Sequence, residues 1–218
     1  MRWTRWLPAA GVLTGTVLLH EVAHAIAAHR MGGAVREVGV GFGPVLARRR
    51  VGGVNVSLRL ILLGGFAAIE IDRLPPARRI PVLLAGPLVN IAAGVALRAL
   101  AGPVQPVTLP GQRSRVEVGG LMAAVAMLIR ASAAGPAALL RAAGDVNLSV
   151  GLANLAPVLP LDGGHLAAAH LEAAGASRAL LAFFRQITAG VFFWIALRVL
   201  LADLARFRMS AAVSPRPQ

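Results

Sequence analysis

Four apolar stretches, each long enough to cross a bilayer as a helix, constrain this chain more than any other feature of its sequence. They run over about residues 7–28, 80–100, 136–159 and 180–201. About 20 apolar residues in a helix cross the roughly 30 Å of hydrocarbon. The third stretch is the most polar, and its Arg141 and Asp145 are four residues apart, a spacing that lets them pair on one helix face. The sequence predicts an α-helical integral membrane protein with about four transmembrane helices.

The composition agrees with a bilayer as the solvent for much of the chain. The sequence is 57% hydrophobic and 14% charged, whereas about a quarter of the residues in a soluble domain are charged. The net charge of +13 arises from 22 basic residues, all arginine. Most of them lie between the apolar stretches, where arginines set membrane topology and meet anionic lipid head groups. They are not interleaved with aromatic residues, so we expect the lipid bilayer and no nucleic acid as a partner.

The loop between the first two stretches predicts how the protein is oriented. It holds nine arginines from Arg30 to Arg79 and three acidic residues. Cytoplasmic loops carry an excess of basic residues, so we expect this loop, and the site beside it, on the cytoplasmic side. Arginines near the C-terminus, which four crossings would place on the opposite side, argue against this orientation.

The same loop contains a predicted β-hairpin over about residues 35–66. Residues 54–60 alternate apolar and polar side chains, and residues 38–46 are rich in glycine and valine. Gly52 and Gly53, after a run of three arginines, supply the turn. Because a sheet edge cannot face lipid without cost, we expect this membrane-associated hairpin to lie against protein or line an aqueous cavity.

The remaining segments complete one membrane-embedded domain, expected over residues 1–209. The apolar run 120–129 is too short to span and is predicted to form an interfacial helix, with an extra crossing as the alternative. Residues 210–218 are predicted to form a disordered tail.

A metal-binding pattern lies within the first apolar stretch, as His20-Glu21-Val22-Ala23-His24. Histidines four residues apart project from the same face of a helix, so both imidazoles can reach one Zn²⁺. Glu21 lies beside the first ligand and can act as a general base on a water without binding the metal. Ionisable residues in an apolar span are costly unless they meet a metal or a cavity. The pattern predicts a zinc hydrolase site with Glu21 as the catalytic residue.

A catalytic zinc needs a third protein ligand, and Asp162 is the best candidate. It follows an apolar run interrupted by Pro157 and Pro160, and two glycines come directly after it. Such a break at membrane depth is tolerated only beside protein or water, as at a site. The alternative is that Asp162 caps the helix that follows. His165 lies three residues further on, and we expect it at the surface or behind the ligands more than on the metal.

Asn90 is a further polar residue in an apolar stretch, the second one. It has two interpretations, as a hydrogen bond between packed helices or as part of the site lining. Gly86 and Gly94 in the same stretch permit close helix packing.

These segments together resemble the site-2 proteases, the zinc metalloproteases that cut membrane-embedded helices. The resemblance covers most of residues 15–175 in the family's order. It rests on His20–His24, Gly41-Phe42-Gly43-Pro44 with Leu63-Gly64-Gly65-Phe66, Ala85-Gly86-Pro87-Leu88-Val89-Asn90, and the run from Asn154 through Asp162-Gly163-Gly164-His165. The family's more usual Asn-Leu-Phe/Leu-Pro is Asn-Leu-Ala-Pro here, which leaves the ligand in place.

The resemblance implies His20, His24 and Asp162 as ligands of one Zn²⁺ per chain and Glu21 as the base. It implies that Asn154 positions the substrate backbone or the oxyanion. It also implies a transmembrane protein as substrate, such as an anti-sigma factor, and a bacterial cytoplasmic membrane as location. Only about 35 residues separate the second and third stretches, too few for the PDZ domain of many relatives, so a minimal form is expected.

Substrate presentation is expected at the predicted strand 54–60. A transmembrane substrate must unwind before cleavage, and Val56 and Leu58 are predicted to bind it by β-addition. Two other functions fit the same residues. One is a catalytically silent membrane regulator, and the other is a zinc transporter that uses the histidine and aspartate residues as a transit site.

Overall fold

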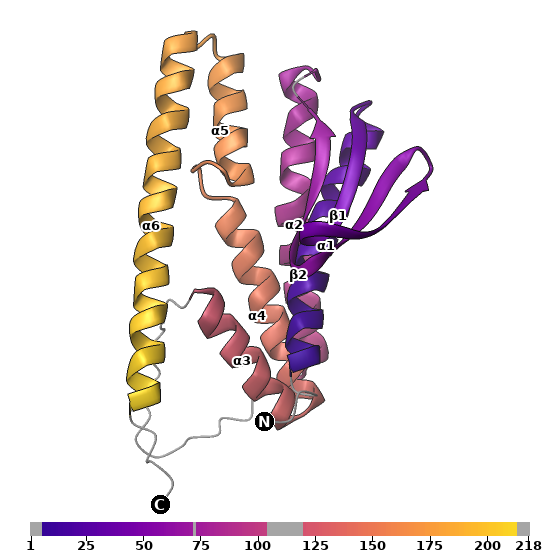
Figure 1. Cartoon of the computed structure of the whole chain (residues 1–218). Coiled ribbons are helices and arrows are strands. Elements are labelled where there is room, and N and C mark those ends of the chain that lie inside the picture. The colour runs from indigo at the N-terminus through magenta and orange to yellow at the C-terminus, as the bar shows by residue number, and fades with distance from the viewer. Residues whose placement is uncertain (1–5, 72, 104–119, 213–218) are drawn as a thin grey trace, which may run out of the picture.

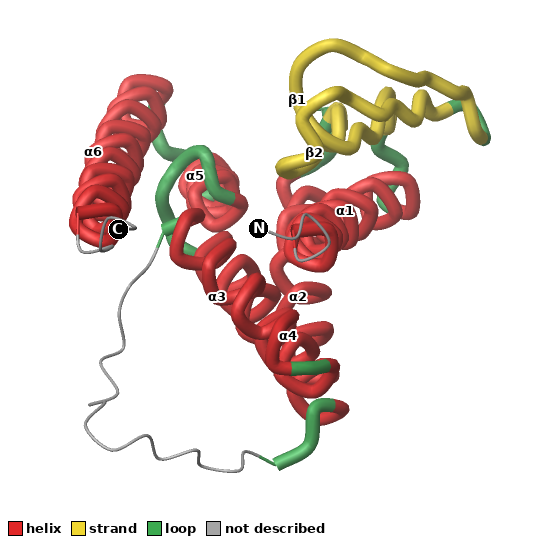
Figure 2. The backbone as a smooth tube through the Cα atoms, turned by 60° about the horizontal axis from the view of Figure 1, so that its bottom comes forward, coloured by secondary structure: helices red, strands yellow, loops and turns green. Residues whose placement is uncertain are grey.

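The computed structural model describes residues 6–71, 73–103 and 120–212, which form a helical bundle with a small sheet against one side (Figure 1). In chain order the elements are α1 (Trp6–Arg30), β1 (Ala34–Val51), β2 (Val54–Glu70), α2 (Pro76–Leu100), α3 (Leu121–Ala134), α4 (Pro136–Asn154), α5 (Asp162–Ala173) and α6 (Arg178–Ala212). The sheet lies against α1, while α5 and α6 lie on the other side of the bundle (Figures 1 and 2).

Three helices in the described part of the chain are long and apolar enough to cross a membrane. They are Trp6–Arg30, Pro76–Leu100 and Arg178–Ala205 within α6. This confirms a mostly helical membrane protein, with three of the four expected helices as candidate crossings. The fourth expected helix, α4, is not among them, and it ends at Asn154 rather than near residue 159. A crossing by α4 remains a prediction.

Glycines bring α4 into close contact with α2. A Cβ added at Gly94 would lie 2.8 Å from the Gly144 carbonyl oxygen, and one added at Gly144 would lie 2.9 Å from the Gly94 carbonyl oxygen. A Cβ at Gly151 would lie 2.7 Å from the carbonyl oxygen of Pro87. Because no other residue fits at these distances, the two backbones approach each other as small residues allow in membrane helices. Gly94 therefore acts as predicted.

The predicted pair of Arg141 with Asp145 does not form. Arg98 of α2 donates to Asp145 at 2.5 Å, and Arg141 donates to the carbonyl oxygen of Gly102 at 2.9 Å. The reason is the close packing of α4 against α2. It places Asp145 next to an arginine of the neighbouring helix, and it places Arg141 at the C-terminal end of α2, where free carbonyl groups require donors.

The chain turns sharply between α4 and α5. The helix stops after Asn154, and α5 begins at Asp162, with two prolines in the connection. A Cβ added at Gly163 would overlap the carbonyl oxygens of Leu155 and Ala156. The glycines are therefore needed because the start of α5 lies directly on the preceding turn, and this packing determines where Asp162 lies.

The β-hairpin is longer than predicted and folds back on itself. Gly52 and Gly53 form the turn with φ angles of 56° and 86°, as expected, and β2 extends to Glu70. Residues 45–51 pair with 54–59, and residues 34–40 pair with 65–70. Residues 37–40 also pair with 55–58. Residues 55–58 therefore have partners on both sides, and the outer segments of this two-stranded sheet are 45–51 and 65–70.

A polar cluster holds the two halves of the sheet together. The Ser57 hydroxyl donates to Glu37 at 2.6 Å, and Arg59 donates to the same carboxylate at 3.2 Å. The Ser57 hydrogen bond, together with Arg59 and Arg48, lowers the pKa of Glu37 below its usual value, against the effect of partial burial. The cluster therefore links Glu37 of β1 to Ser57 and Arg59 of β2, where the hairpin folds back on itself.

The short helix α3 is part of the bundle. Its 14 residues fall below the about 20 that a crossing needs, and its Leu128 is fully buried with Ala9 of α1 and Val146 of α4. The backbone N–H of Met122 donates to Asp203 of α6 at 3.2 Å. This contact supplies an acceptor at the N-terminal end of α3, where backbone donors have no partner within the helix.

The C-terminal helix is longer than expected. α6 runs through Ala212, so residues 210–212 are helical rather than part of a tail. The rest of the predicted tail, residues 213–218, lies outside the described residues.

Candidate metal centre

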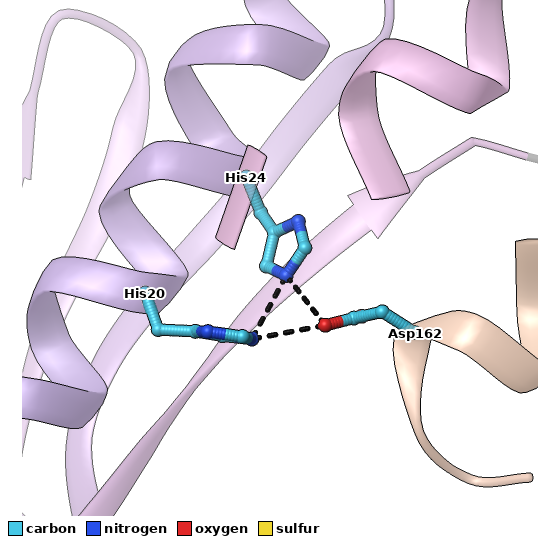
Figure 3. Close-up of side chains that lie close together, drawn as sticks. All are labelled: His20, His24 and Asp162. Atoms are coloured by element: carbon cyan, nitrogen blue, oxygen red, sulfur yellow. Dashed lines mark hydrogen bonds and ion pairs between the residues drawn. The ribbon is translucent and has the colours of Figure 1, made fainter. Parts of the chain in front are cut away.

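His20 and His24 lie one turn apart on α1 and point to the same place. Each is 6% exposed. Their ring centroids are 4.6 Å apart with the planes at 80°, and their Nε2 atoms are 3.0 Å apart. Figure 3 shows both Nε2 atoms turned toward one carboxylate. The helical spacing therefore does what the sequence predicted and directs two ring nitrogens to one point.

Asp162 brings the third candidate ligand atom from the first turn of α5. Its Oδ2 lies 3.0 Å from Nε2 of His20 and 3.2 Å from Nε2 of His24. The three ligand atoms lie within 4.8 Å of one another. The N-terminus of α5 has no side-chain cap, so the alternative role of Asp162 as a helix cap is wrong. Two imidazoles and a carboxylate are the donor set of a catalytic zinc with one open position.

Helix α2 leaves space for the two imidazole rings at Gly86. A Cβ added at Gly86 would lie 2.7 Å from Nε2 of His20 and would overlap Nε2 of His24. Only glycine leaves the two Nε2 atoms free at this position. One turn earlier on α2, the Val82 carbonyl oxygen accepts a hydrogen bond from Nδ1 of His24 at 2.7 Å. That bond leaves Nε2 of His24 as the nitrogen available for metal.

We predict that Gly86→Ala weakens zinc binding by about 10- to 100-fold, the range found when groups behind metal ligands are changed. The added methyl group takes the space of the two Nε2 atoms. The measurement is a competition titration of the purified protein with a chromophoric zinc chelator. Gly15→Ala is the matched control, because a Cβ there meets no atom within 4 Å. Equal zinc affinity in Gly86→Ala and Gly15→Ala would show that the Gly86 contact does not matter.

Glu21 shares the cavity but not the ligand set. It is half-buried, and the backbone amide of Ala67 in β2 hydrogen-bonds to its carboxylate. The ligand group within the described residues contains His20, His24 and Asp162 without Glu21. A carboxylate beside the metal ligands and free of the metal has the geometry of a general base.

These residues surround one cavity of about 390 Å³. Five elements contribute to its wall, which is formed by His20, Glu21, His24, Ala67, Ile69, Ile71, Val82, Leu83, Asn154, Pro160, Asp162 and His165. His165 is exposed and lies outside the ligand group, as expected from the sequence. The volume of the cavity lies within the range of about 300–1,000 Å³ that is usual for ligand-binding clefts.

Asn154 lies in the cavity wall, whereas Val56 and Leu58 do not. Nδ2 of Asn154 donates to the Val150 carbonyl oxygen at 3.0 Å. Val56 and Leu58 line a separate hollow beside Val40. Residues 55–58 are paired on both sides, so the expectation of a free strand edge at 54–60 is wrong. Their role in substrate binding remains a prediction about side chains, which are 42% and 41% exposed.

Two residues of β2 that line the cavity together with Glu21 were not predicted from the sequence. Ala67 and Ile69 line the cavity from the outer segment 65–70, beyond the predicted end of the hairpin. The signal was the apolar run after Gly64-Gly65, which continues to Ile69 and fits a longer strand.

Comparisons with known proteins agree with this geometry. The profile of peptidase family M50 matches residues 8–199. The zinc metalloprotease Rip1 of Mycolicibacterium smegmatis is 35% identical over 102 residues, which are 38% of this chain and 25% of that protein. Rip3 of Mycobacterium tuberculosis is 30% identical over 169 residues, 76% of this chain and 32% of that protein. The membrane metalloprotease ARASP of Arabidopsis thaliana is 38% identical over 76 residues, 35% of this chain and 17% of that protein.

A helical membrane fold with a His-Glu-x-x-His helix and a distant aspartate defines a class of membrane zinc metalloproteases. The chain belongs to peptidase family M50, the site-2 protease family. It spans about a third or less of the length of the relatives above. The solved site-2 protease of Methanocaldococcus jannaschii aligns with a TM-score of 0.49 and 22% identity over 91% of this chain and 68% of that one.

Proposed function

We propose that this chain is an intramembrane zinc endopeptidase that hydrolyses peptide bonds within or beside the transmembrane segments of other membrane proteins. The observation that carries the proposal is the convergence of three zinc-ligand atoms and a non-ligand carboxylate in one cavity between apolar helices. A catalytically silent regulator or a transit site for zinc needs no carboxylate held next to the ligands. Glu21 therefore favours hydrolysis over both alternatives.

The residues that would hold one Zn²⁺ are His20 and His24 through Nε2 and Asp162 through Oδ2. When bound, Zn²⁺ supplies Lewis acidity, which polarises the scissile carbonyl and makes water a better nucleophile near neutral pH. The two helices that carry the ligands are far apart in sequence, so folding of the bundle assembles the site.

Glu21 carries the proton in this proposal. Its carboxylate takes the proton of the attacking water and returns it to the leaving nitrogen of the cleaved bond. The Ala67 amide holds the carboxylate in the cavity. Proton transfer by a positioned side chain contributes about 10²- to 10⁴-fold to an enzyme's rate, so Glu21 is the residue on which turnover depends most after the ligands.

Asn154 would stabilise the negative oxygen that forms on the substrate carbonyl. Its Nδ2 group donates within its own helix to Val150, and a change of side-chain rotamer would turn this donor into the cavity that Asn154 lines. One donor aimed at such an oxygen is worth about 10²- to 10³-fold in rate.

The outer segment 65–70 of the sheet is the place where we propose that substrate binds in extended form. The segment has register partners only in residues 34–40 within the described sheet, and Ala67 and Ile69 line the cavity. The Ala67 backbone amide lies within reach of the Glu21 carboxylate, and backbone groups two residues apart in a strand face the same way. We therefore propose that the Ile69 amide pairs with an added substrate strand beside this carboxylate.

We predict that Ile69→Pro lowers cleavage at least about 10-fold without changing zinc affinity. Proline removes the backbone N–H that would pair with the substrate, because its ring nitrogen carries no hydrogen. Ile69→Ala is the matched control, because it removes more side-chain packing and keeps the N–H. Cleavage is followed by immunoblotting of a tagged single-span substrate. An equal loss in Ile69→Pro and Ile69→Ala would point to packing and would remove the case for strand addition.

The distribution of arginines supports a proposal for how the protein lies in the membrane. We propose that α4 is the fourth crossing, that the arginine-rich hairpin and the site face the cytoplasm of a bacterial cell, and that the substrate is a transmembrane regulator such as an anti-sigma factor. Arg48, Arg49 and Arg50 are exposed in the sheet, where they can meet anionic lipid head groups.

The test of the proposed function is co-expression of the chain with tagged single-span membrane proteins. We expect shortened products that disappear when a zinc chelator is added. A parallel measurement of zinc uptake by vesicles containing the protein separates the transporter alternative. Uptake without any shortened product would replace the protease by a transporter.

A further inference from the structure

Asn90 of α2 is buried next to His20 and is not one of the candidate metal ligands. It is 0% exposed, and its Nδ2 atom lies 3.2 Å from Nδ1 of His20. Its Oδ1 atom is buried and has no hydrogen-bond partner within the part of the chain that the structure describes. Val82, Gly86 and Asn90 follow each other at four-residue spacing on α2, so they form one stripe that faces the two histidines.

The protonation of His20 decides which atom of Asn90 must face it. The Nε2 atoms of both histidines point to Asp162 and to each other, so the metal would bind through Nε2. A neutral imidazole that binds metal through Nε2 carries its proton on Nδ1, which is then a donor. His24 satisfies this rule, because its Nδ1 has the Val82 carbonyl oxygen as acceptor at 2.7 Å.

His20 needs an equivalent acceptor, and the Asn90 amide can supply it. Rotation by 180° about the last side-chain bond exchanges Oδ1 and Nδ2 without changing the shape of the amide. In that orientation Oδ1 takes the place of Nδ2, 3.2 Å from Nδ1 of His20. The proton on Nδ1 gains an acceptor, and Nδ2 takes the buried place in which Oδ1 has no partner among the described residues.

We propose that Asn90 is a positioning residue of the metal centre, whose amide oxygen accepts the Nδ1–H of His20 and so holds Nε2 ready for the metal. The proposal rests on the metal centre of the proposed function and adds its outer support. α2 contributes no ligand, yet its stripe supplies an acceptor for each histidine and, at Gly86, the space between them. Partners of this kind fix the tautomer and orientation of a ligand, and their loss costs about 10- to 100-fold in metal affinity.

Zinc affinity of the purified full chain, measured by competition with a chromophoric chelator, tests the proposal. We expect Asn90→Leu, which has a similar size and no acceptor, to bind Zn²⁺ about 10- to 100-fold more weakly. We expect Asn90→Asp, which keeps an acceptor oxygen, to bind as tightly as the wild type or more tightly. With Co²⁺ in place of Zn²⁺, the visible spectrum of Asn90→Asp should match that of the wild type.

Asn147→Leu is the matched control for removing a buried amide from the helix bundle. Asn147 is 4% exposed, also has an unpartnered Oδ1, and donates to Thr16 and Ala143 rather than to the metal centre. We expect its zinc affinity to equal that of the wild type. If Asn90→Leu does not fold, Asn90→Ala takes its place in the comparison with Asn90→Asp.

Two results would overturn the inference while leaving the proposed function intact. One is a zinc affinity of Asn90→Leu within about twofold of the wild-type value, because removal of a group that supports a metal ligand should cost about 10- to 100-fold. The other is an equal loss in Asn90→Leu and Asn90→Asp, which would show that burial and not the acceptor matters. A wild-type protein that binds no zinc would instead overturn the metal centre and the proposed function with it.

Discussion

Replacement of Glu21 by glutamine should abolish cleavage and leave zinc binding intact. The two side chains have the same shape, but the amide cannot take a proton from water, so we expect cleavage to fall by about 10²- to 10⁴-fold, the contribution of a positioned acid–base group. Zinc affinity should stay near the wild-type value, because Glu21 lies outside the group of ligand atoms. Product formation from a single-span substrate and zinc content are measured on the same preparations.

The control for this substitution is Asp145→Asn, which also converts a carboxylate to an amide. Asp145 pairs with Arg98 in an exposed ion pair and does not line the cavity, so cleavage should be unchanged. Equal cleavage by Glu21→Gln and the wild type would remove Glu21 from the mechanism. It would return the silent regulator and the transporter as interpretations of the fold.

Replacement of Asp162 by alanine should have the opposite signature and remove both zinc and cleavage. Within the described ligand group, two ligand atoms belong to α1 and the third is Oδ2 of Asp162. This oxygen contacts both Nε2 atoms. The remaining two histidines form an incomplete site, because a catalytic zinc uses three protein ligands. We expect zinc affinity to fall by more than about 100-fold, because that is the upper limit of the loss when a group that only supports a ligand is removed.

His165→Ala serves as the comparison for Asp162→Ala. His165 lines the same cavity three residues further along α5 and is not one of the ligands. Its replacement should leave one zinc per chain. If His165→Ala lost the metal and Asp162→Ala kept it, the third ligand would be assigned to the wrong residue of α5.

The sequence predicted that His20, His24 and Asp162 come together, and the structure shows this convergence, whereas their role as ligands stays a prediction. Spacing along one helix determines that His20 and His24 share a face, and that does not depend on tertiary structure. Asp162 was predictable from the proline-broken run before it. The bounds of the long helices were predicted to within a few residues, except that α4 ends earlier and α6 ends later than expected. Prolines show where a helix breaks, whereas hydropathy alone does not show where a helix ends.

Features that depend on packing between distant segments were not predictable. The outer segment beside the cavity is 65–70 because the hairpin folds back and uses both sides of residues 55–58, and no periodicity in the sequence shows that. Asp145 pairs with Arg98 rather than with its neighbour Arg141 because α2 lies alongside. The Val82 carbonyl behind His24 is a backbone group, so side-chain identity carries no sign of it.

The position of the cut bond distinguishes an intramembrane protease from a protease that cuts outside the membrane. The purified wild-type protein, reconstituted with zinc and a single-span substrate in vesicles, should release fragments whose masses place the cleaved bond within or beside the apolar segment. The Glu21→Gln protein should release none. Fragments cut only in segments far from the membrane, or the same fragments from Glu21→Gln, would contradict an intramembrane protease built on His20, Glu21, His24 and Asp162.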